Sequence, residues 1–195
     1  MGEGRQMEDM GGRSRENVAL IGFMGAGKSE VGRLLAGRLG MEFKDLDEVV
    51  SSRAGMSIED IFASEGESGF RERESAALRE ALQGDKMVIS CGGGIVLDGG
   101  NVALLRGSCR VFLLRISAHK AVERLSAGDG RPLLAGGNLE ERVHGLLDSR
   151  AQIYLHAAHE VVEADYASPR KLAEEIAERW LKYRSGQGDG NTPSS

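Results

Sequence analysis

Residues 22–29 read Gly-Phe-Met-Gly-Ala-Gly-Lys-Ser, which fits the phosphate-loop pattern G-x-x-x-x-G-K-S/T. A short apolar run at residues 18–21 precedes this loop and predicts a buried strand. Apolar residues recur downstream at helical spacing, at Val31, Leu34, Leu35 and Leu39. A strand, a glycine loop and a helix therefore follow in order. This context favours a nucleoside triphosphate site over the alternative, a chance glycine-rich turn before a helix.

The residue types in the loop suit the binding of phosphate groups. Glycines let several backbone N–H groups point at phosphate oxygens, and the positive end of the following helix adds to the attraction. Lys28 is expected to reach the β- and γ-phosphates, and the hydroxyl of Ser29 to ligate Mg²⁺. The predicted ATP-binding residues of this segment are Gly25, Ala26, Gly27, Lys28, Ser29 and Glu30. The loop by itself leaves open whether the protein is a kinase, an ATPase or a GTP switch.

Length and charge narrow the class of protein. The 195 residues predict one domain, which is less chain than motor ATPases usually need. The net charge is −5 and the basic residues are spread along the chain, unlike the pattern of a nucleic-acid-binding protein. No run approaches the ~18 apolar residues of a membrane span. Cys91 and Cys109 fit no disulfide or zinc spacing and are interpreted as core residues. We therefore expect a soluble, cytoplasmic protein without nucleic-acid or membrane partners.

The two ends of the chain differ from its middle in composition. Residues 1–16 are rich in Gly, Glu and Arg and lack an apolar stretch, so they are predicted to form a disordered tail. Residues 185–195 are small and polar without periodicity, and a second disordered tail is predicted there. Residues 17–184 contain neither an internal repeat nor a linker and are expected to form the single domain.

Apolar strand candidates alternate with helix-like segments between these tails. After residues 18–21, the candidates are residues 42–44, 87–90, 111–114 and 161–162. This alternation predicts parallel strands joined by crossover helices. Ser168 and Pro169 suit the cap and first position of the last helix. The apolar stripe of that helix is formed by Leu172, Ile176 and Trp180.

Two aspartates, Asp45 and Asp47, stand at the carboxyl end of the second predicted strand, where ligands of open α/β sheets bind. One could hold Mg²⁺, while the other could orient a hydroxyl nucleophile and accept its proton. The alternative is that one or both cap the next helix. Gly92, Gly93 and Gly94 close the third predicted strand, which indicates either close approach of the backbone to a ligand or a plain flexible turn.

Two further segments carry arginines. In residues 61–74 the charges alternate in sign along a predicted helix, as they do on a solvated, salt-bridged face, so Arg71 alone favours a structural role. Residues 128–137 place Arg131 in a glycine-flanked loop. A loop of this kind can close over a substrate and bring in positive charge.

Together these motifs resemble those of the shikimate kinases. The resemblance covers residues 18–183 and is carried by residues 22–29, Asp45 and Asp47, residues 61–74, residues 92–94, residues 131–134, and Arg150 four residues before Tyr154. A phosphate loop alone is unspecific about the acceptor. The full set in this order and spacing is highly specific.

The resemblance implies a fold and a reaction. The fold is a three-layer α/β/α P-loop kinase fold with a five-stranded parallel sheet, similar to nucleoside monophosphate kinases. It includes a substrate-binding region near residues 46–75 and a lid near residues 126–138. The reaction is transfer of the γ-phosphoryl group of ATP to the 3-hydroxyl of shikimate, with Mg²⁺, in the route to chorismate and aromatic amino acids. The family is usually monomeric, which implies a monomer here.

On the ATP side, the resemblance assigns a role to five side chains. Lys28 would contact the phosphates, Ser29 would ligate Mg²⁺, and Asp45 would hold the metal through water. Arg131 would be the lid arginine that reaches the transferring phosphate. Arg124 would lie against the adenine.

On the acceptor side, the resemblance assigns Asp47 to the shikimate hydroxyls, with the role of general base. Arg71 and Arg150 would grip the shikimate carboxylate, and a planar guanidinium matches a carboxylate with two parallel hydrogen bonds. Gly92, Gly93 and Gly94 would present backbone to the substrate ring.

Two features depart from the family pattern. Glu30 places a carboxylate beside the phosphates, where it would repel nucleotide, so we expect its side chain to point away. Residues 152–156 read Gln-Ile-Tyr-Leu-His, whereas the family commonly has Pro-Leu-Tyr followed by acidic residues. Two alternatives therefore stay open. One is another small-molecule kinase on this scaffold, such as a gluconate kinase, and the other is a noncatalytic kinase-like protein.

Overall fold

The sheet is the centre of the molecule. The structure is a computed structural model that describes residues 16–126 and 138–188, and these residues form five parallel strands in the order β2-β3-β1-β4-β5. The strands are β1 (Asn17–Ile21), β2 (Glu42–Asp45), β3 (Met87–Ser90), β4 (Cys109–Arg115) and β5 (Glu160–Glu163). Val18 of β1 lies opposite Val88 of β3 and Arg110 of β4. Because all strands run the same way, their carboxyl ends share one edge of the sheet.

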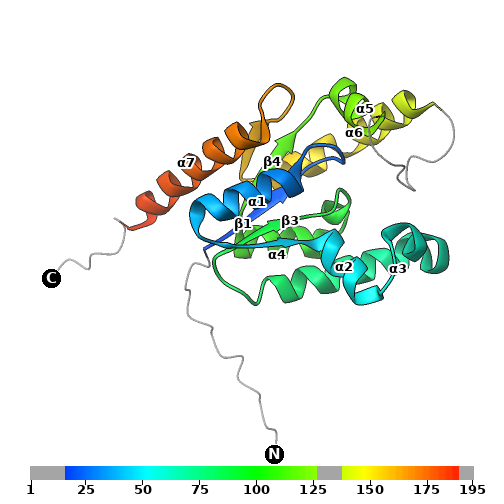
Figure 1. Cartoon of the computed structure of the whole chain (residues 1–195), viewed down its shortest axis with the longest axis horizontal. Coiled ribbons are helices and arrows are strands. Elements are labelled where there is room, and N and C mark those ends of the chain that lie inside the picture. Colours follow the sequence, from blue (N-terminus) through cyan, green and yellow to red (C-terminus); the bar gives the residue numbers. More distant parts are fainter. Residues whose placement is uncertain (1–15, 127–137, 189–195) are drawn as a thin grey trace, which may run out of the picture.

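Helices cover both faces of this sheet (Figure 1). They are α1 (Lys28–Leu39), α2 (Leu46–Ala54), α3 (Ile58–Ala81), α4 (Gly99–Ser108), α5 (Ala118–Ser126), α6 (Leu139–Ala157) and α7 (Pro169–Gly188), with a short 3₁₀ turn, η1 (Ile95–Leu97). Helices α1 and α7 pack against each other, and α4 and α6 both contact β4. The predicted three-layer α/β fold with five parallel strands is thus confirmed. None of the described helices combines the length and the apolar character needed to cross a bilayer.

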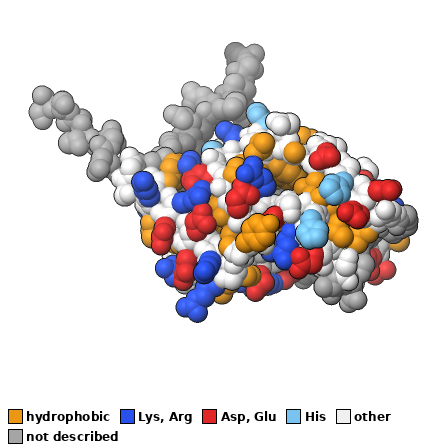
Figure 2. Space-filling model, turned by 90° about the horizontal axis from the view of Figure 1, so that it is seen from above, with side chains coloured by type: hydrophobic (Ala, Val, Ile, Leu, Met, Phe, Trp, Pro, Cys, Tyr) orange, Lys and Arg blue, Asp and Glu red, His pale blue; other side chains and the backbone are white. Residues whose placement is uncertain are grey.

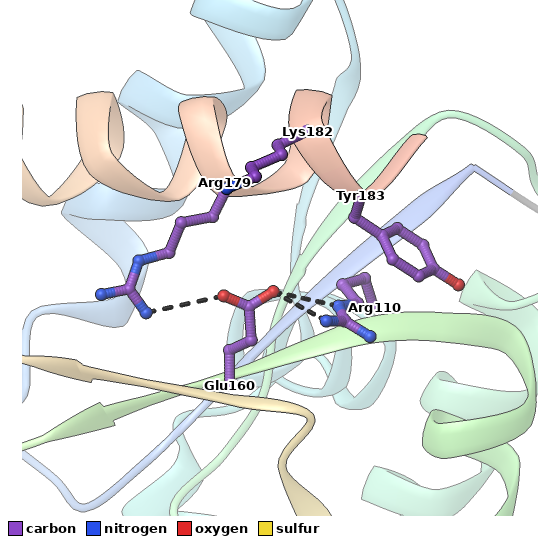
Figure 3. Close-up of a pocket in the computed structure, with 5 residues that line it drawn as sticks. All are labelled: Arg110, Glu160, Arg179, Lys182 and Tyr183. Atoms are coloured by element: carbon purple, nitrogen blue, oxygen red, sulfur yellow. Dashed lines mark hydrogen bonds and ion pairs between the residues drawn. The ribbon is translucent and has the colours of Figure 1, made fainter. Parts of the chain in front are cut away.

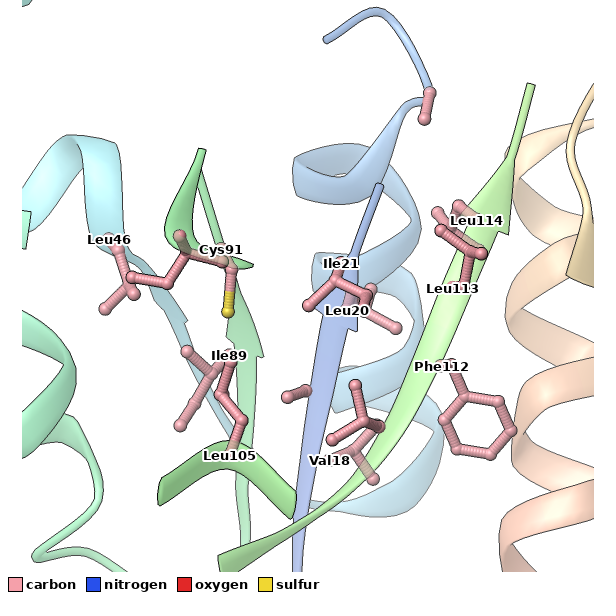
Figure 4. Close-up of a cluster of buried hydrophobic side chains, with 14 of the residues drawn as sticks. Val18, Leu20, Ile21, Leu46, Ile89, Cys91, Leu105, Phe112, Leu113 and Leu114 are labelled. Carbon is pink, nitrogen blue, oxygen red and sulfur yellow. The ribbon is translucent and has the colours of Figure 1, made fainter. Parts of the chain in front are cut away.

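The core consists of apolar side chains from the central strands and the helices that cover them. Leu20 and Ile21 of β1 and Phe112 of β4 are fully buried, and Figure 4 shows these side chains gathered with others around the sheet. Each such side chain contributes about 1.5–3 kcal/mol relative to an exposed one. Cys91 and Cys109 are buried, as expected for core residues, and the described residues contain no disulfide between them. On the surface, acidic and basic side chains intermingle over the face shown in Figure 2.

Helix α7 begins where the sequence predicts. The backbone carbonyl of Ser168 accepts a hydrogen bond from the Leu172 N–H at 3.0 Å, and Pro169 is the first helical residue. The helix continues to Gly188, so the residues from 185 to 188, assigned to a tail from their composition, are helical. Near this end, the guanidinium of Arg184 pairs with Glu16, which connects the helix to the residue before β1. The same guanidinium lies 4.9 Å from the ring centroid of Trp180 in the preceding turn of α7.

Helix α3 contains a break that shapes the substrate-binding region. Gly66 has φ 71° and ψ −177°, outside the helical range, so α3 consists of two helical pieces that meet there. Arg73 in the second piece binds both carboxylate oxygens of Glu65 in the first, each at 2.7 Å. A left-handed φ of this kind costs a non-glycine residue roughly 1–2 kcal/mol. The break at Gly66 and the Glu65–Arg73 ion pair, called the Glu65–Arg73 clasp below, therefore set the direction of the second helical piece, which carries Arg71.

Candidate active site

The phosphate loop lies directly after the central strand. Gly22 has φ 143°, and a Cβ atom at this position would lie 2.5 Å from the backbone oxygen of Leu114 in the neighbouring strand, so only glycine fits. The loop then turns, with the Ala26 N–H donating to the Phe23 carbonyl at 3.2 Å. Helix α1 begins immediately afterwards at Lys28. The loop therefore opens onto the positive end of a helix, which favours a phosphate group.

Lys28 folds back over this loop. Its ammonium group donates to the carbonyls of Gly22 at 2.8 Å and Phe23 at 3.0 Å, so its charge stands above the loop. Ser29 is half-buried in the first turn of α1, and Glu30 beside it is exposed. Glu30 is therefore accessible to solvent, and that its carboxylate points away from the nucleotide stays a prediction.

Arg124 connects three parts of the nucleotide side. From α5, its Nη1 donates to the carbonyl of Gly25 at 2.9 Å and its Nη2 donates to the carbonyl of Ala164 at 2.8 Å. A Cβ atom at Gly27 would lie 3.9 Å from Nη1. The guanidinium therefore lies beside the phosphate loop and joins it to the segment after β5. Arg131, the predicted lid arginine, lies outside the described residues.

The two aspartates after β2 have different surroundings. Asp45 is buried and caps α2, because its carboxylate accepts the Asp47 N–H at 3.0 Å. Helix capping, the alternative role considered for the two aspartates, is therefore carried out by at least one carboxylate oxygen of Asp45. Asp47 lies in the first turn of α2 and reaches residues 92–94, called the glycine run below, because a Cβ atom at Gly92 would lie 3.0 Å from its Oδ1. The structure thus brings Asp47 to the end of β3.

Glu74 faces the same glycine from α3. Its side chain is fully buried, and its Oε1 would overlap a Cβ atom placed on Gly92. Oε2 accepts a 2.6 Å hydrogen bond from Nη1 of Arg71, whereas Oε1 has no hydrogen-bond partner in the described part of the chain. Burial raises the pKa of Glu74, and the neighbouring Arg71 offsets this only in part. The sequence pattern includes Glu74 but gives it no role, because a burial of this kind has no local signature.

The glycine run leaves room for side chains of the protein itself. A Cβ atom on Gly94 would overlap the guanidinium of Arg71, just as one on Gly92 would overlap Glu74. The carbonyl of Gly93 accepts a hydrogen bond from the hydroxyl of Tyr154. Side chains of α3 and α6 therefore approach these glycines closely, and the predicted approach to a ligand stays a prediction.

Arg150 reaches the site from α6. It is only 7 % exposed, and its Nη1 has no hydrogen-bond partner within residues 16–126 and 138–188. Arg150 also hydrogen-bonds the side chain of Tyr154, whose pKa is raised to about 12, mainly by burial. Arg71 thus lies against Gly94, whereas Arg150 is connected to Gly93 through Tyr154, whose hydroxyl donates to the Gly93 carbonyl.

A separate pocket of about 360 Å³ lies at the opposite, amino edge of β4 and β5 (Figure 3). Glu160 sits between two guanidinium groups there, with Arg110 Nη2 at 2.9 Å and Arg179 Nη1 at 3.5 Å. The Arg110 guanidinium also lies 4.1 Å from the ring centroid of Tyr183. These groups satisfy one another and fasten α7 to the sheet edge, far from the phosphate loop.

The comparisons with known proteins agree with this geometry. A family model described as Shikimate kinase matches residues 24–181. A shikimate kinase of Pseudomonas paraeruginosa is 45% identical over 166 residues, which are 85% of this chain and 96% of the relative. The chain belongs to the shikimate kinase family. The resemblance found in the sequence is thereby confirmed.

Solved structures of the family have the same fold. A shikimate kinase from Acinetobacter baumannii in complex with shikimate has a TM-score of 0.83 and 36% identity, covering 86% of this chain and 94% of that one. The enzyme from Aquifex aeolicus has a TM-score of 0.74 and 31% identity, covering 90% and 99%. A gluconokinase from Sinorhizobium meliloti, at 15% identity and a TM-score of 0.56, shares only the fold.

Proposed function

We propose that this member of the shikimate kinase family transfers the γ-phosphoryl group of ATP to the 3-hydroxyl of shikimate. The observation that carries the proposal is Arg150, a buried cation whose Nη1 has no hydrogen-bond partner among the described residues and whose neighbour Tyr154 hydrogen-bonds Gly93. A buried donor without a partner is costly, and a bound carboxylate would supply the missing acceptor. Arg71 provides a second guanidinium, which lies against Gly94, and we propose that the two arginines together bind a small carboxylic acid.

Asp47 supports the acceptor's identity as an alcohol. Its carboxylate lies near Gly92, and we propose that there it orients a hydroxyl group and accepts its proton. Lys28 stands over the loop and would move its ammonium from the carbonyls to the phosphates. Phosphoryl transfer depends mainly on such positioning and on charge stabilisation. We assign Arg131 the same electrostatic task on the transferring group.

The oxygen donors near the loop suit Mg²⁺. The Ser29 hydroxyl and the Asp45 carboxylate are hard oxygen ligands, and Mg²⁺ usually takes one or two protein oxygens, with water and substrate phosphates completing its shell. Asp45 gives one oxygen to the Asp47 N–H, which leaves the other for the metal or its water. When bound, the ion would neutralise charge on the phosphates.

We also propose a cellular compartment and an oligomeric state for the protein. Buried cysteines that are not joined in a disulfide in the described structure, Cys91 and Cys109, fit a reducing compartment such as the cytoplasm. Burial raises the pKa of the Cys91 thiol well above its ordinary range, which makes it a poor nucleophile. We propose that the active unit is the monomer, because both arginines and the phosphate loop come from one chain.

The test is release of ADP from Mg-ATP in the presence of shikimate, quinate, gluconate or no acceptor. We expect turnover only with shikimate, and its loss in Asp47→Asn. Turnover with gluconate alone would favour the other small-molecule kinase. ATP binding without stimulation by any acceptor would favour a noncatalytic protein.

A further inference from the structure

Arg71 is held by two carboxylates before any acceptor binds. Its Nη1 donates to Glu74 Oε2 at 2.6 Å, and its Nε and Nη2 both donate to Glu67 Oε1, at 3.3 Å and 3.1 Å. The Nε and Nη2 edge of a guanidinium is one of the two edges that bind a carboxylate in parallel hydrogen bonds. Glu67 therefore occupies an edge that a carboxylic acid could use.

The two carboxylates differ in how firmly they are held. Glu74 has a side chain only 1 % exposed and cannot leave Arg71 without a large rearrangement, whereas the side chain of Glu67 is 51% exposed. Glu67 can therefore rotate into water and be hydrated there. Burial alone would lower the pKa of Arg71, and the charges of Glu74 and Glu67 more than offset this.

The break in α3 places Glu67 at this position. Gly66 interrupts the helix, so Glu67 begins the second piece, where the positive helix end favours a carboxylate. Arg71 follows four residues later on the same face, in the order that suits an acidic residue and a basic one. The Glu65–Arg73 clasp holds the two pieces together across the break. Glu67 is thereby kept within reach of Arg71.

We propose that Glu67 is an internal competitor for the carboxylate of the acceptor. By binding Arg71 in the free enzyme, it weakens acceptor binding, and the acceptor must either displace it or bind beside a like charge. This inference rests on the proposed function, since it takes the acceptor to be a carboxylic acid bound at Arg71. A site of this design releases anions more readily than Arg71 and Arg150 alone would.

The test compares Glu67→Gln with Glu72→Gln. Both changes remove one negative charge from α3, but Glu72 is exposed and directly follows Arg71, so it points to another side of the helix. An exposed ion pair of this kind corresponds to about a two- to fivefold change in binding. We expect Glu67→Gln to lower the KM for shikimate by that factor, and the Kd for shikimate measured by calorimetry without ATP to fall with it. Glu72→Gln should leave both unchanged.

Two controls separate competition from other effects. The gain should shrink between about 50 mM and about 500 mM salt, because exposed charges are screened. It should also vanish in an Arg71→Gln background, since Glu67 acts only through Arg71. An unchanged or raised KM and Kd in Glu67→Gln, or a gain that persists without Arg71, would overturn the inference. If the wild type and Glu72→Gln fail to phosphorylate shikimate, the proposed function fails instead.

Discussion

Replacing Gly94 by alanine tests the position of Arg71 without replacing a charged residue. Gly94 has φ −107° and ψ 0°, which alanine can adopt, so the change introduces little backbone strain. The new methyl group would instead overlap the guanidinium of Arg71, whose Nη2, Cζ and Nη1 are its nearest neighbours. The clash therefore acts on one side chain.

The size of the effect follows from that overlap. The guanidinium must retreat by roughly 1.5 Å to reach ordinary contact with the methyl group. The 2.6 Å hydrogen bond from Arg71 to Glu74 would not survive such a shift, and Arg71 would lose its place beside the acceptor. A charge-assisted hydrogen bond contributes about 1.5–3 kcal/mol. A loss of about 2 kcal/mol corresponds to roughly a 30-fold drop in kcat/KM for shikimate.

The assay is steady-state kinetics with each substrate varied in turn. We expect Gly94→Ala to raise the KM for shikimate, with little change in the KM for ATP, since Arg124 and the loop are untouched. Gly99→Ala is the matched control, because an added Cβ there meets no described atom within 4 Å. In the helix it should raise stability by up to about 1 kcal/mol and leave the kinetics alone.

One result would refute this account. A folded Gly94→Ala protein with kcat/KM for shikimate within threefold of the wild type would mean that Arg71 does not hold the acceptor from the position seen here. A loss confined to the KM for ATP would have the same meaning.

Three other changes test the remaining contacts. The pKa of Glu74 is raised in the folded protein, so its ionised carboxylate destabilises the fold increasingly as the pH rises above the ordinary pKa of 4.5. Glu74→Gln should therefore gain in Tm relative to the wild type as the pH rises. A difference in Tm that is independent of pH would contradict this. Asp45→Asn should keep the α2 cap and raise the Mg²⁺ requirement, whereas Asp45→Ala should also lower the free energy of unfolding by about 1 kcal/mol in urea titrations; equal stabilities would exclude the cap. Tyr154→Phe should cost about 1–3 kcal/mol of stability and remove a phenol that titrates near pH 12 in difference spectra; equal stability of the two proteins would contradict this.

The elements of the sheet could be predicted closely from the sequence because their signals are local. The limits of β3 match the predicted residues 87–90, and α7 begins at Pro169 as expected. The phosphate loop is also a contiguous pattern, and its glycines mark the positions where the backbone adopts conformations that other residues avoid. The end of α7 was not predictable from composition, since Arg184 and Tyr183 contact residues distant in the chain.

The candidate site was predictable only as a set of residue types. The motifs name Arg71, Arg150 and the glycine run, yet neither spacing nor periodicity says that Arg150 is buried with an Nη1 that finds no partner in the described part of the chain. Nor do they distinguish Asp45, which caps a helix, from Asp47, which reaches Gly92. Glu67 and Glu74 look alike in the sequence as acidic neighbours of Arg71. One is exposed and the other fully enclosed.

The sequence by itself determined the nucleotide-binding loop, the alternation of strands and helices, and the family, since each depends on residues adjacent in the chain or on their order. The tertiary structure alone decided which side chains meet at the glycine run. Tyr154 and Gly93, for example, are 61 residues apart and join through one hydrogen bond. Such contacts depend on how the helices pack around the sheet, and the burial that results raises the pKa of Glu74.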